Sequence, residues 1–392
     1  MMALPPGLRS RAALGLTAAA ALGRFELQVC RECGTVQYPP REACHCCLSV
    51  QLDWQLQTSG GELISTTTLF HSHNEYFRAR LSWRLGMVRL DCGPTVITHL
   101  HAGVEVPPAR VRVDVRLDKA GQAVLIALPV SPVERIFEDK VLQEMSCDPR
   151  SREVLVTDGH SAVGQSLVRA LVAAGARRVW VGDRSPDNWT AELDALVLLG
   201  SVMILPLDLR SSESVAEAGA QLGARLDIII NNAEYHGVAS SRGVGAAQAQ
   251  MEINYFGLLR LAQGFGPAMR VRAGEERGAM AWVNLLSIYA LANNPSHGTF
   301  SASKAAALSL SQCLRAQMQS FGIRVINVFP GPIDDEGNRL EPPPKIGADA
   351  LAREIIKALQ LGREDVYPGD VAQEWFARWR ANPKVLEREL AT

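Results

Sequence analysis

The sequence lacks any long hydrophobic run and any excess of charge of one sign. No apolar stretch among its 392 residues approaches the roughly 20 that a membrane-spanning helix needs, so we expect no membrane association. Lys and Arg number 40 against 41 Asp and Glu, and the net charge of −1 argues against a broad nucleic-acid-binding surface. Internal repeats and low-complexity tracts are also missing. These absences favour a globular protein with ordinary cores.

The composition present is sufficient for more than one domain. Hydrophobic residues make up 47% and charged residues 21%, which permits large cores, and the length predicts two or three domains. Residues 1–24 contain three arginines and no acidic residue, a weak targeting signal that we interpret as an Ala-rich helix. The eight cysteines are not spaced like a secreted disulfide framework, so we expect a reducing, cytoplasmic location.

Two cysteine pairs carry the strongest local signal. Cys30-x-x-Cys33 is followed, after ten residues, by Cys44-x-x-Cys47, and two such knuckles can offer four thiolates to one tetrahedral Zn²⁺. Four thiolates close the coordination shell, so the metal would stabilise the fold and do no chemistry. His45 and Cys46 lie inside the second pair and leave the choice of ligands open, and free or redox-active thiols are the alternative to a metal site.

Alternating segments follow the cysteines. Residues 62–70 and 111–117 alternate apolar and polar side chains between Gly-rich turns, a pattern typical of antiparallel strands in a small barrel. We therefore predict a helix and zinc ribbon over residues 1–50 and an OB-like β-barrel over 51–147. A short polar stretch at 145–152, containing Pro149, predicts the boundary to a third domain over 152–392.

The order of motifs in residues 12–140 resembles a known family. The first Cys pair with Gly34, the run Tyr38-Pro39-Pro40-Arg41, the second pair, and the runs 59–67 and 88–94 are similar to rubredoxin-like zinc-ribbon/OB-fold proteins associated with thiolases and acyl-CoA enzymes. The resemblance implies an accessory role beside a thiolase or aldolase, with acyl-CoA as a possible ligand. An OB fold alone can instead bind nucleic acid, but basic–aromatic interleaving is thin here, so we expect no nucleic-acid partner.

After residue 152 strands alternate with helices. Residues 163–174 have helical apolar spacing, and strand-like runs are listed as follows: 154–157, 179–181, 202–205, 226–230, 281–284 and 324–328. Strand–helix alternation predicts a doubly wound parallel sheet of the Rossmann type, covered by helices on both faces. The predicted fold class is therefore α/β, with an N-terminal zinc ribbon and small β-barrel.

Four positions in this half resemble the catalytic set of the short-chain dehydrogenase/reductase family. Asn254, Ser287 and Lys304 stand where the family keeps Asn, Ser and Lys, but Phe300 stands where it keeps Tyr. The resemblance implies that the Tyr hydroxyl transfers the substrate proton while the Lys lowers its pKa and holds the nicotinamide ribose. Phe300 has no ionisable group, and general acid–base catalysis contributes roughly 10²–10⁴-fold in rate. The resemblance therefore implies a remnant catalytic set, for which Tyr289 or His297 is a possible substitute acid.

Positions that resemble the family's dinucleotide-binding residues are only partly kept. They are Gly159 and Gly164 in the first turn, Asp183, Asp208, Asn231, Pro330 and Gly331. Asp158 adds a negative charge where a diphosphate would lie, Ala162 replaces a turn glycine, and Glu234 replaces the Gly of Asn-Asn-Ala-Gly, where it would crowd or repel the ribose. The resemblance implies NAD as the cofactor, with binding weakened by these three residues.

Our leading hypothesis is a catalytically impaired dehydrogenase-like subunit in a hetero-oligomer. It would assemble with an active short-chain dehydrogenase, a thiolase-type enzyme, or both, in β-oxidation-like acyl-CoA metabolism, with residues 246–263 and 301–320 as interface helices. The alternatives are an active NAD-dependent 3-hydroxyacyl-CoA dehydrogenase with an atypical acid, and a binding protein that senses nucleotide or acyl-CoA.

Overall fold

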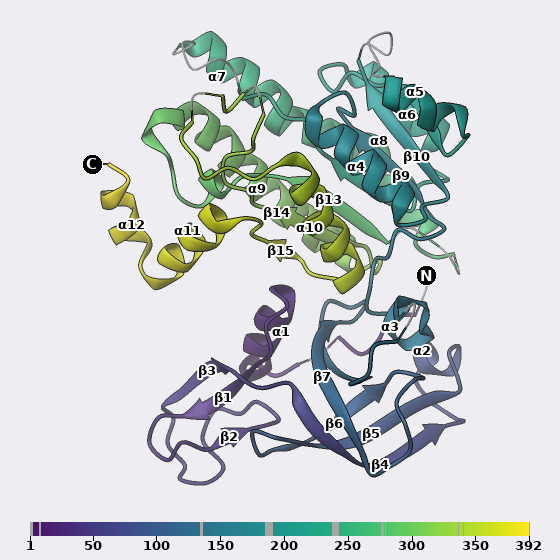
Figure 1. The fold of residues 1–392 in the computed structure, drawn as a ribbon, viewed down its shortest axis with the longest axis vertical. Coiled ribbons are helices and arrows are strands. Elements are labelled where there is room, and N and C mark those ends of the chain that lie inside the picture. Colours follow the sequence, from purple (N-terminus) through teal and green to yellow (C-terminus); the bar gives the residue numbers. More distant parts are fainter. Residues whose placement is uncertain are drawn as a thin grey trace. The chain divides into compact units, whose positions relative to one another are not determined.

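The fold divides into two compact units, which are described separately (Figure 1). The computed structural model describes residues 3–7, 9–133, 136–184, 191–236, 243–275, 278, 280–335, 337–339 and 341–391. The first unit comprises Met1–Asp148 with Gln360–Arg363, and the second comprises Pro149–Leu359 with Glu364–Thr392.

The first unit contains a small antiparallel sheet and a closed barrel. Helix α1 (Leu14–Ala21) precedes the sheet, whose strand order is β2 (Val36–Gln37), β1 (Glu26–Cys30), β3 (Leu52–Leu56). The barrel closes in the order β4 (Gly60–Leu69), β5 (Trp83–Leu90), β6 (Thr95–Leu100), β8 (Ala123–Pro129), β7 (Ala109–Leu117). Short helices α2 (Glu75–Arg78) and α3 (Lys140–Gln143) complete this unit. Five closed strands agree with the predicted small barrel.

The core of the barrel is formed by every second side chain along its strands. Leu63, Val88, Leu100 and Val113 point inward and are buried, whereas their neighbours along each strand are more exposed, as expected when one face of an antiparallel sheet is covered. The β4–β5 register shifts between Leu63 and Ser65, where a β-bulge bends the strand as barrel closure requires.

The second unit is built on a seven-stranded parallel sheet. Its order is β11 (Val202–Pro206), β10 (Arg178–Asp183), β9 (Glu153–Thr157), β12 (Ile228–Asn231), β13 (Ala281–Leu285), β14 (Arg324–Val328), β15 (Asp365–Val366). The chain runs outward from β9 to β11 and then returns to place β12 on the other side of β9. That reversal creates a crevice at the carboxyl ends of β9 and β12, where ligands bind in doubly wound folds.

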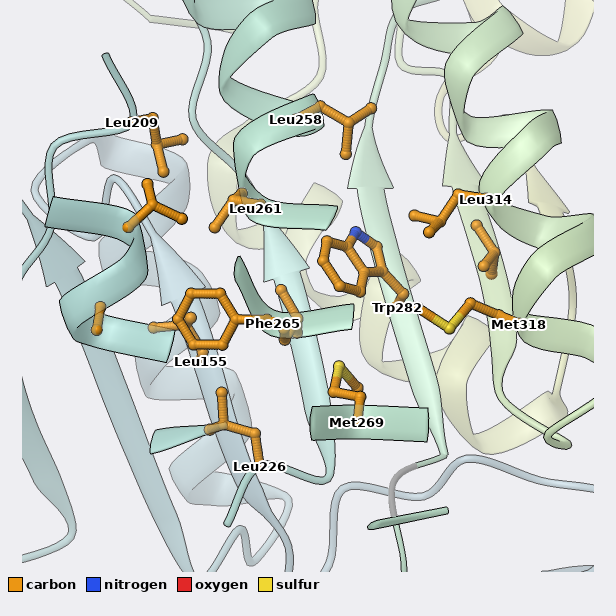
Figure 2. Packing of buried hydrophobic residues seen from close by; sticks show 14 of the residues in the cluster. Leu155, Leu209, Leu226, Leu258, Leu261, Phe265, Met269, Trp282, Leu314 and Met318 are labelled. Carbon is orange, nitrogen blue, oxygen red and sulfur yellow. The ribbon is translucent and has the colours of Figure 1, made fainter. Parts of the chain in front are cut away.

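Helices cover both faces of this sheet (Figure 1). In chain order they are α4 (Ala162–Ala173), α5 (Ala191–Leu198), α6 (Ser212–Leu222), α7 (Val244–Met251), α8 (Leu258–Arg272), α9 (Gly298–Gln319) and α10 (Ala348–Leu361), followed by α11 (Asp370–Ala381) and α12 (Pro383–Glu389). Figure 2 shows the core that α6, α8 and α9 build against one face, in which Phe265, Trp282 and Met318 are buried. Burial of each such side chain contributes about 1.5–3 kcal/mol, which anchors the sheet beneath the crevice.

The structure differs from two sequence-based expectations. The helix expected over residues 246–263 is present and runs without a break from α7 into α8, but its segment Glu252–Gly257 is π-helical. Strand β15 was not predicted, since only two residues pair with β14. Within the described ranges, no helix combines the length and apolar character needed to cross a bilayer.

Candidate functional site

The four cysteines of the two knuckles converge on one point. The sulfurs of Cys30, Cys33, Cys44 and Cys47 all lie within 4.8 Å of one another, with Cys30–Cys47 at 3.5 Å and Cys33–Cys44 at 3.6 Å. Tetrahedral Zn–S bonds of 2.3 Å require sulfurs about 3.8 Å apart, so the set fits a structural Zn²⁺. Cys46 and His45 lie outside this set, because the His45 ring contacts Gln37 Oε1 at 3.2 Å. The predicted ligands are therefore brought together.

The two knuckles share one backbone geometry. Gly34 N donates to Cys30 O at 2.9 Å, and Leu48 N donates to Cys44 O at 3.0 Å. Both residues that follow the second cysteine have a positive φ, +71° for Gly34 and +63° for Leu48. Glycine adopts this conformation without steric cost, whereas leucine does not, so the second knuckle is strained at Leu48.

In the second unit, the turn from β9 to α4 forms the wall of the crevice. A Cβ at Gly164 would lie 2.3 Å from Asp158 O, and one at Gly159 would lie 1.9 Å from Val181 Cγ1, so both positions require glycine. Ser161 caps α4 by accepting a hydrogen bond from Gly164 N at 3.1 Å. Asn232 Nδ2 donates to Thr157 O, Asp158 O and Ser161 Oγ, which fixes the turn against the end of β12.

Asp158 occupies a position in this turn whose backbone conformation is unfavourable for a non-glycine residue. Its φ is +50°, in the left-handed region. Burial, and then the nearby Asp183 carboxylate, raise the pKa of Asp158 to about 6. Near neutral pH the turn therefore presents a negative charge on the side where a helix N-terminus would otherwise attract a phosphate group.

The other predicted cofactor residues lie at the carboxyl ends of neighbouring strands. Asp183 is buried at the end of β10, and Asn231, at the end of β12, accepts a hydrogen bond from Thr157 Oγ1 at 3.2 Å. Asp208 follows β11 and accepts bonds from Arg210 at 3.0 and 2.8 Å, and this guanidinium lowers the pKa of Asp208. Thus the strand-end residues converge, although Asp208 already has a cationic partner.

Phe300 and Ser287 line one small cavity. Phe300, on α9, is buried, and its ring stacks on His236 with a centroid separation of 4.1 Å and an interplanar angle of 14°. Ser287 begins a 3₁₀ turn after β13, and its Oγ accepts a hydrogen bond from Tyr289 N at 3.2 Å. The described lining also includes Glu234, Pro330 and Gly331. The cavity volume is about 10 Å³, close to the space that one water molecule needs.

Lys304 is paired with Glu234 beneath this cavity. Lys304 Nζ lies 2.6 Å from Glu234 Oε2 and donates to Leu285 O at 3.0 Å, and only 1% of the lysine is exposed. Its ammonium group is also 5.5 Å from the centre of the Phe300 ring. The sequence-based expectation was that Glu234 would act against the cofactor ribose; the structure adds that it neutralises the buried lysine.

Asn254 lies in the π-helical segment, and its side chain bonds the backbone of Tyr235. Its Oδ1 accepts from Tyr235 N at 2.9 Å, and its Nδ2 donates to Tyr235 O at 3.1 Å and to Ser303 Oγ at 2.9 Å. Short π-helical insertions are frequent at functional sites. Here the insertion turns Asn254 toward the strand β12 extension that carries Glu234.

A chain of three titratable side chains ends at the cavity with His236 and was not predicted as a unit. Glu341 Oε1 lies 2.6 Å from His297 Nε2, and His297 Nδ1 lies 3.0 Å from His236 Nε2. Burial lowers the pKa of His236, and burial raises the pKa of Tyr289. Of the two possible acids that sequence reasoning singled out, Tyr289 lines the cavity and His297 does not, while His236, which was not singled out, lines it beside Ser287.

Comparison with known proteins identifies one domain in each half of the chain. Residues 152–342 match the sequence model for "short chain dehydrogenase", and residues 17–53 match "ChsH2, rubredoxin-like zinc ribbon domain". A short chain dehydrogenase from Burkholderia cenocepacia J2315, whose crystal structure is in complex with NADP, is 33% identical in sequence to this chain. It has a TM-score of 0.55, and the match covers 62% of this chain and 99% of that one. The chain belongs to the short-chain dehydrogenase family.

Curated relatives match the same half. Dehydrogenase/reductase SDR family member 7B of Rattus norvegicus is 33% identical over 193 residues, covering 46% of this chain and 58% of the rat protein. Its Danio rerio counterpart is 28% identical over 254 residues, covering 58% of this chain and 81% of the fish protein. The predicted fusion of a zinc ribbon with a short-chain dehydrogenase domain is therefore confirmed, and the roles of individual site residues stay predictions.

The frame of the crevice fits a nicotinamide dinucleotide. Gly159 and Gly164 allow a tight turn at the start of α4, because a Cβ at either would clash with Val181 or with the backbone of the turn, and Asp183, Asn231 and the Pro330–Gly331 loop lie at the carboxyl ends of β10, β12 and β14. Such a cofactor would supply or accept a hydride. Asp158 carries a negative charge in this turn above about pH 6, and Glu234 pairs with Lys304.

Proposed function

We propose that this chain is a dehydrogenase-like subunit whose own alcohol–carbonyl chemistry is impaired and whose role depends on assembly. The observation that carries the proposal is the 2.6 Å ion pair between Lys304 and Glu234 beside Phe300. A lysine assists this chemistry only when its charge is available to a hydroxyl or a ribose. Here the charge is satisfied by a carboxylate, and the neighbouring ring carries no hydroxyl.

The impairment extends to cofactor binding. An NAD(P) diphosphate would approach Asp158 at the first turn, where the carboxylate is ionised above about pH 6. The negative charges of the diphosphate and of the Asp158 carboxylate repel each other, which disfavours binding. This repulsion adds to the loss of Lys304 as a hydrogen-bond donor to the ribose. We infer weak binding of either NAD or NADP by the isolated chain.

The first unit supports an assembly role. A closed four-cysteine site leaves no open position for substrate, so the zinc would act on the fold alone. We infer that the barrel is an OB-type fold and that it contacts a partner. Met87 and Ile97 face each other across β5 and β6, and with Ile64 they present exposed apolar side chains on the outside of the barrel. Neighbouring exposed apolar residues are a feature of protein–protein contact sites.

The partner we propose is an active short-chain dehydrogenase, a thiolase-type enzyme, or both, acting on acyl-CoA. This proposal rests on the resemblance of the first unit to thiolase-associated proteins. It is tested by purifying the full chain from its native cells and assaying hydroxyacyl-CoA oxidation and thiolysis in the same fractions. Both activities should co-elute with the chain, and a chain that elutes alone without either would contradict the assembly role.

The impairment is tested with the variants Phe300→Tyr, Glu234→Gly and their combination. We expect wild type and Phe300→Tyr to oxidise 3-hydroxybutyryl-CoA slowly with NAD⁺ or NADP⁺, because Glu234 still holds Lys304. The double variant frees the lysine beside a new hydroxyl, so it should gain at least about 10²-fold in turnover. Tight binding of NADP⁺ to wild type in calorimetry, with turnover equal to that of the double variant, would overturn the proposal.

A further inference from the structure

We propose that His236 Nδ1 is the proton-transfer atom of this cavity, in place of the missing phenol. The inference rests on the proposed function in one respect, because it concerns the slow alcohol–carbonyl turnover that an impaired subunit retains. It assigns His236 as the residue that touches the substrate hydroxyl, and His297 and Glu341 as the residues that position it.

The hydrogen bonds fix which nitrogen carries the proton. Glu341 is a carboxylate and can only accept, so His297 must donate to it from Nε2 across 2.6 Å. When His297 is neutral, its Nδ1 is an acceptor and receives the Nε2–H of His236 across 3.0 Å. In its neutral form His236 therefore has a free lone pair on Nδ1. A chain that ends in a carboxylate selects this tautomer, in the way that an orienting acid holds a catalytic histidine.

The free nitrogen is available to a molecule in the cavity. His236 Nδ1 is buried and has no hydrogen-bond partner among the described residues, and the His236 side chain lines the cavity together with Ser287. A buried polar atom without a partner is costly and calls for an explanation. The cavity has room for about one water-sized group, so a substrate hydroxyl that reaches into it and donates to Nδ1 would satisfy that atom, with Ser287 beside it to orient the oxygen.

The ring is placed by Phe300. The two rings are nearly parallel, with centroids 4.1 Å apart, and the His297 ring stacks on Tyr289 with centroids 5.7 Å apart. Phe300 thus supplies a flat apolar support for the imidazole at the position where the family's phenol would stand. The substitution that removes one proton carrier therefore helps to hold another.

Burial favours the neutral form of His236. The groups that face it are Glu234, His297, Lys304 and Asp335, and burial outweighs the two carboxylates, so the pKa of His236 is lowered. At neutral pH the base is thus ready to accept a proton. In alcohol oxidation the O–H proton would move to Nδ1 while the C–H hydride leaves to a nicotinamide cofactor, and reduction reverses both transfers.

Histidine-selective ¹⁵N NMR of the full chain tests the tautomer directly. The His236 signal is assigned by its loss in His236→Gln, with His73→Gln as a control at an exposed histidine outside the cavity. We expect Nδ1 to be unprotonated at pH 7.5 and to titrate below pH 6.5. His297→Gln and Glu341→Gln should remove the tautomer preference. A protonated Nδ1 at pH 7.5 overturns the proposal.

The pH profile tests the chemical role. With 3-hydroxybutyryl-CoA and NAD⁺ or NADP⁺, wild-type kcat should be constant at high pH and fall as His236 becomes protonated. His236→Gln should lower kcat about 10²-fold, abolish that acidic limb and change KM little. His297→Gln should shift the limb and lower kcat less. An unchanged profile in His236→Gln, or no turnover by wild type, overturns this inference and leaves the proposed impairment standing.

Discussion

Glu234 Oε2 lies 2.6 Å from Lys304 Nζ, although Glu234 belongs to the loop after β12 and Lys304 to the second turn of α9. The lysine is almost fully buried, and a buried ammonium without a counter-charge is strongly unfavourable. With Phe300 one turn before it, the lysine has no phenol to serve as a partner. Glu234 therefore gives Lys304 a structural role, which explains how the buried lysine is tolerated beside Phe300.

Breaking this pair should destabilise the second unit. The side chains are 2% and 18% exposed, so Glu234→Gln leaves Lys304 charged and poorly solvated. Removing one partner of a buried pair costs 3–5 kcal/mol when both are fully buried, and the partial exposure of Glu234 reduces this to about 2–3 kcal/mol. Urea denaturation followed by intrinsic fluorescence will measure the loss.

A double-mutant cycle separates the pair from general damage at the site. Lys304→Met removes the charge and keeps most of the stem, so Glu234→Gln in that background should cost less than 1 kcal/mol, as roughly expected when no buried charge remains. Equal costs in the two backgrounds would show that the ion pair is not the source of the effect.

Much of the fold could be predicted because its signals are local. The six runs of apolar residues became β9 to β14, and the cysteine spacing predicted the zinc ligands, since two knuckles of fixed geometry bring four sulfurs together. Strand β15 escaped prediction because two residues are too few for a periodic pattern. The π-helical turn at Asn254 also has no local signature, as its neighbours favour an ordinary helix.

The site was only partly predictable, because its decisive contacts link distant segments. Residues 236, 297 and 341 lie far apart in the chain, with His297 ending the 3₁₀ helix Pro295–His297, and no spacing rule joins them. For Glu234 a signal did exist: when a buried lysine loses its phenol, a new acid elsewhere in the same motif set is the natural counter-charge. That reasoning requires the fold first, since only the parallel sheet brings the ends of β12 and β13 together.

Asp158 should make stability depend on pH in a defined direction. Its pKa is 3.8 in an unperturbed chain and about 6 in the fold. Because the folded pKa is raised, the associated stability is fully present below about pH 4 and is lost as pH rises through about 6. Asp158→Asn, which tolerates the left-handed conformation, should therefore gain about 1–2 kcal/mol at pH 8, allowing for partial exposure, and nothing at pH 3.5.

Thermal melts at both pH values check this prediction. Asp208→Asn provides a control of opposite sign, because Arg210 lowers the pKa of Asp208 and its contribution is present at neutral pH and lost in acid. A gain for Asp158→Asn that is equal at pH 3.5 and pH 8 would show that steric fit, and not charge, is responsible. The same variant should also bind NADP⁺ more tightly above pH 6.

The zinc site offers a test with its control inside the same knuckle. Cys44 belongs to the four-sulfur set and is buried, whereas Cys46, two residues later, is exposed and outside it. We expect Cys46→Ser to retain one zinc per chain by elemental analysis and to melt like wild type. Cys44→Ser should lose the metal and unfold the ribbon, because metal binding contributes directly to folding in such sites. Equal zinc content in the two variants would contradict the ligand assignment.

The second knuckle should be improvable at Leu48. This residue has a φ of +63° and is 78% exposed, so its side chain gains little from packing while the backbone conformation costs about 1 kcal/mol for a non-glycine residue. Leu48→Gly should therefore raise the stability of the zinc-loaded chain by about 1 kcal/mol, offset slightly by the extra freedom of glycine in the unfolded state.

At the equivalent place in the first knuckle, Gly34 has a φ of +71° and open space around its missing Cβ. Gly34→Ala should thus lose about as much as Leu48→Gly gains, and chelator-dependent melting of both variants will show whether the two effects have opposite signs.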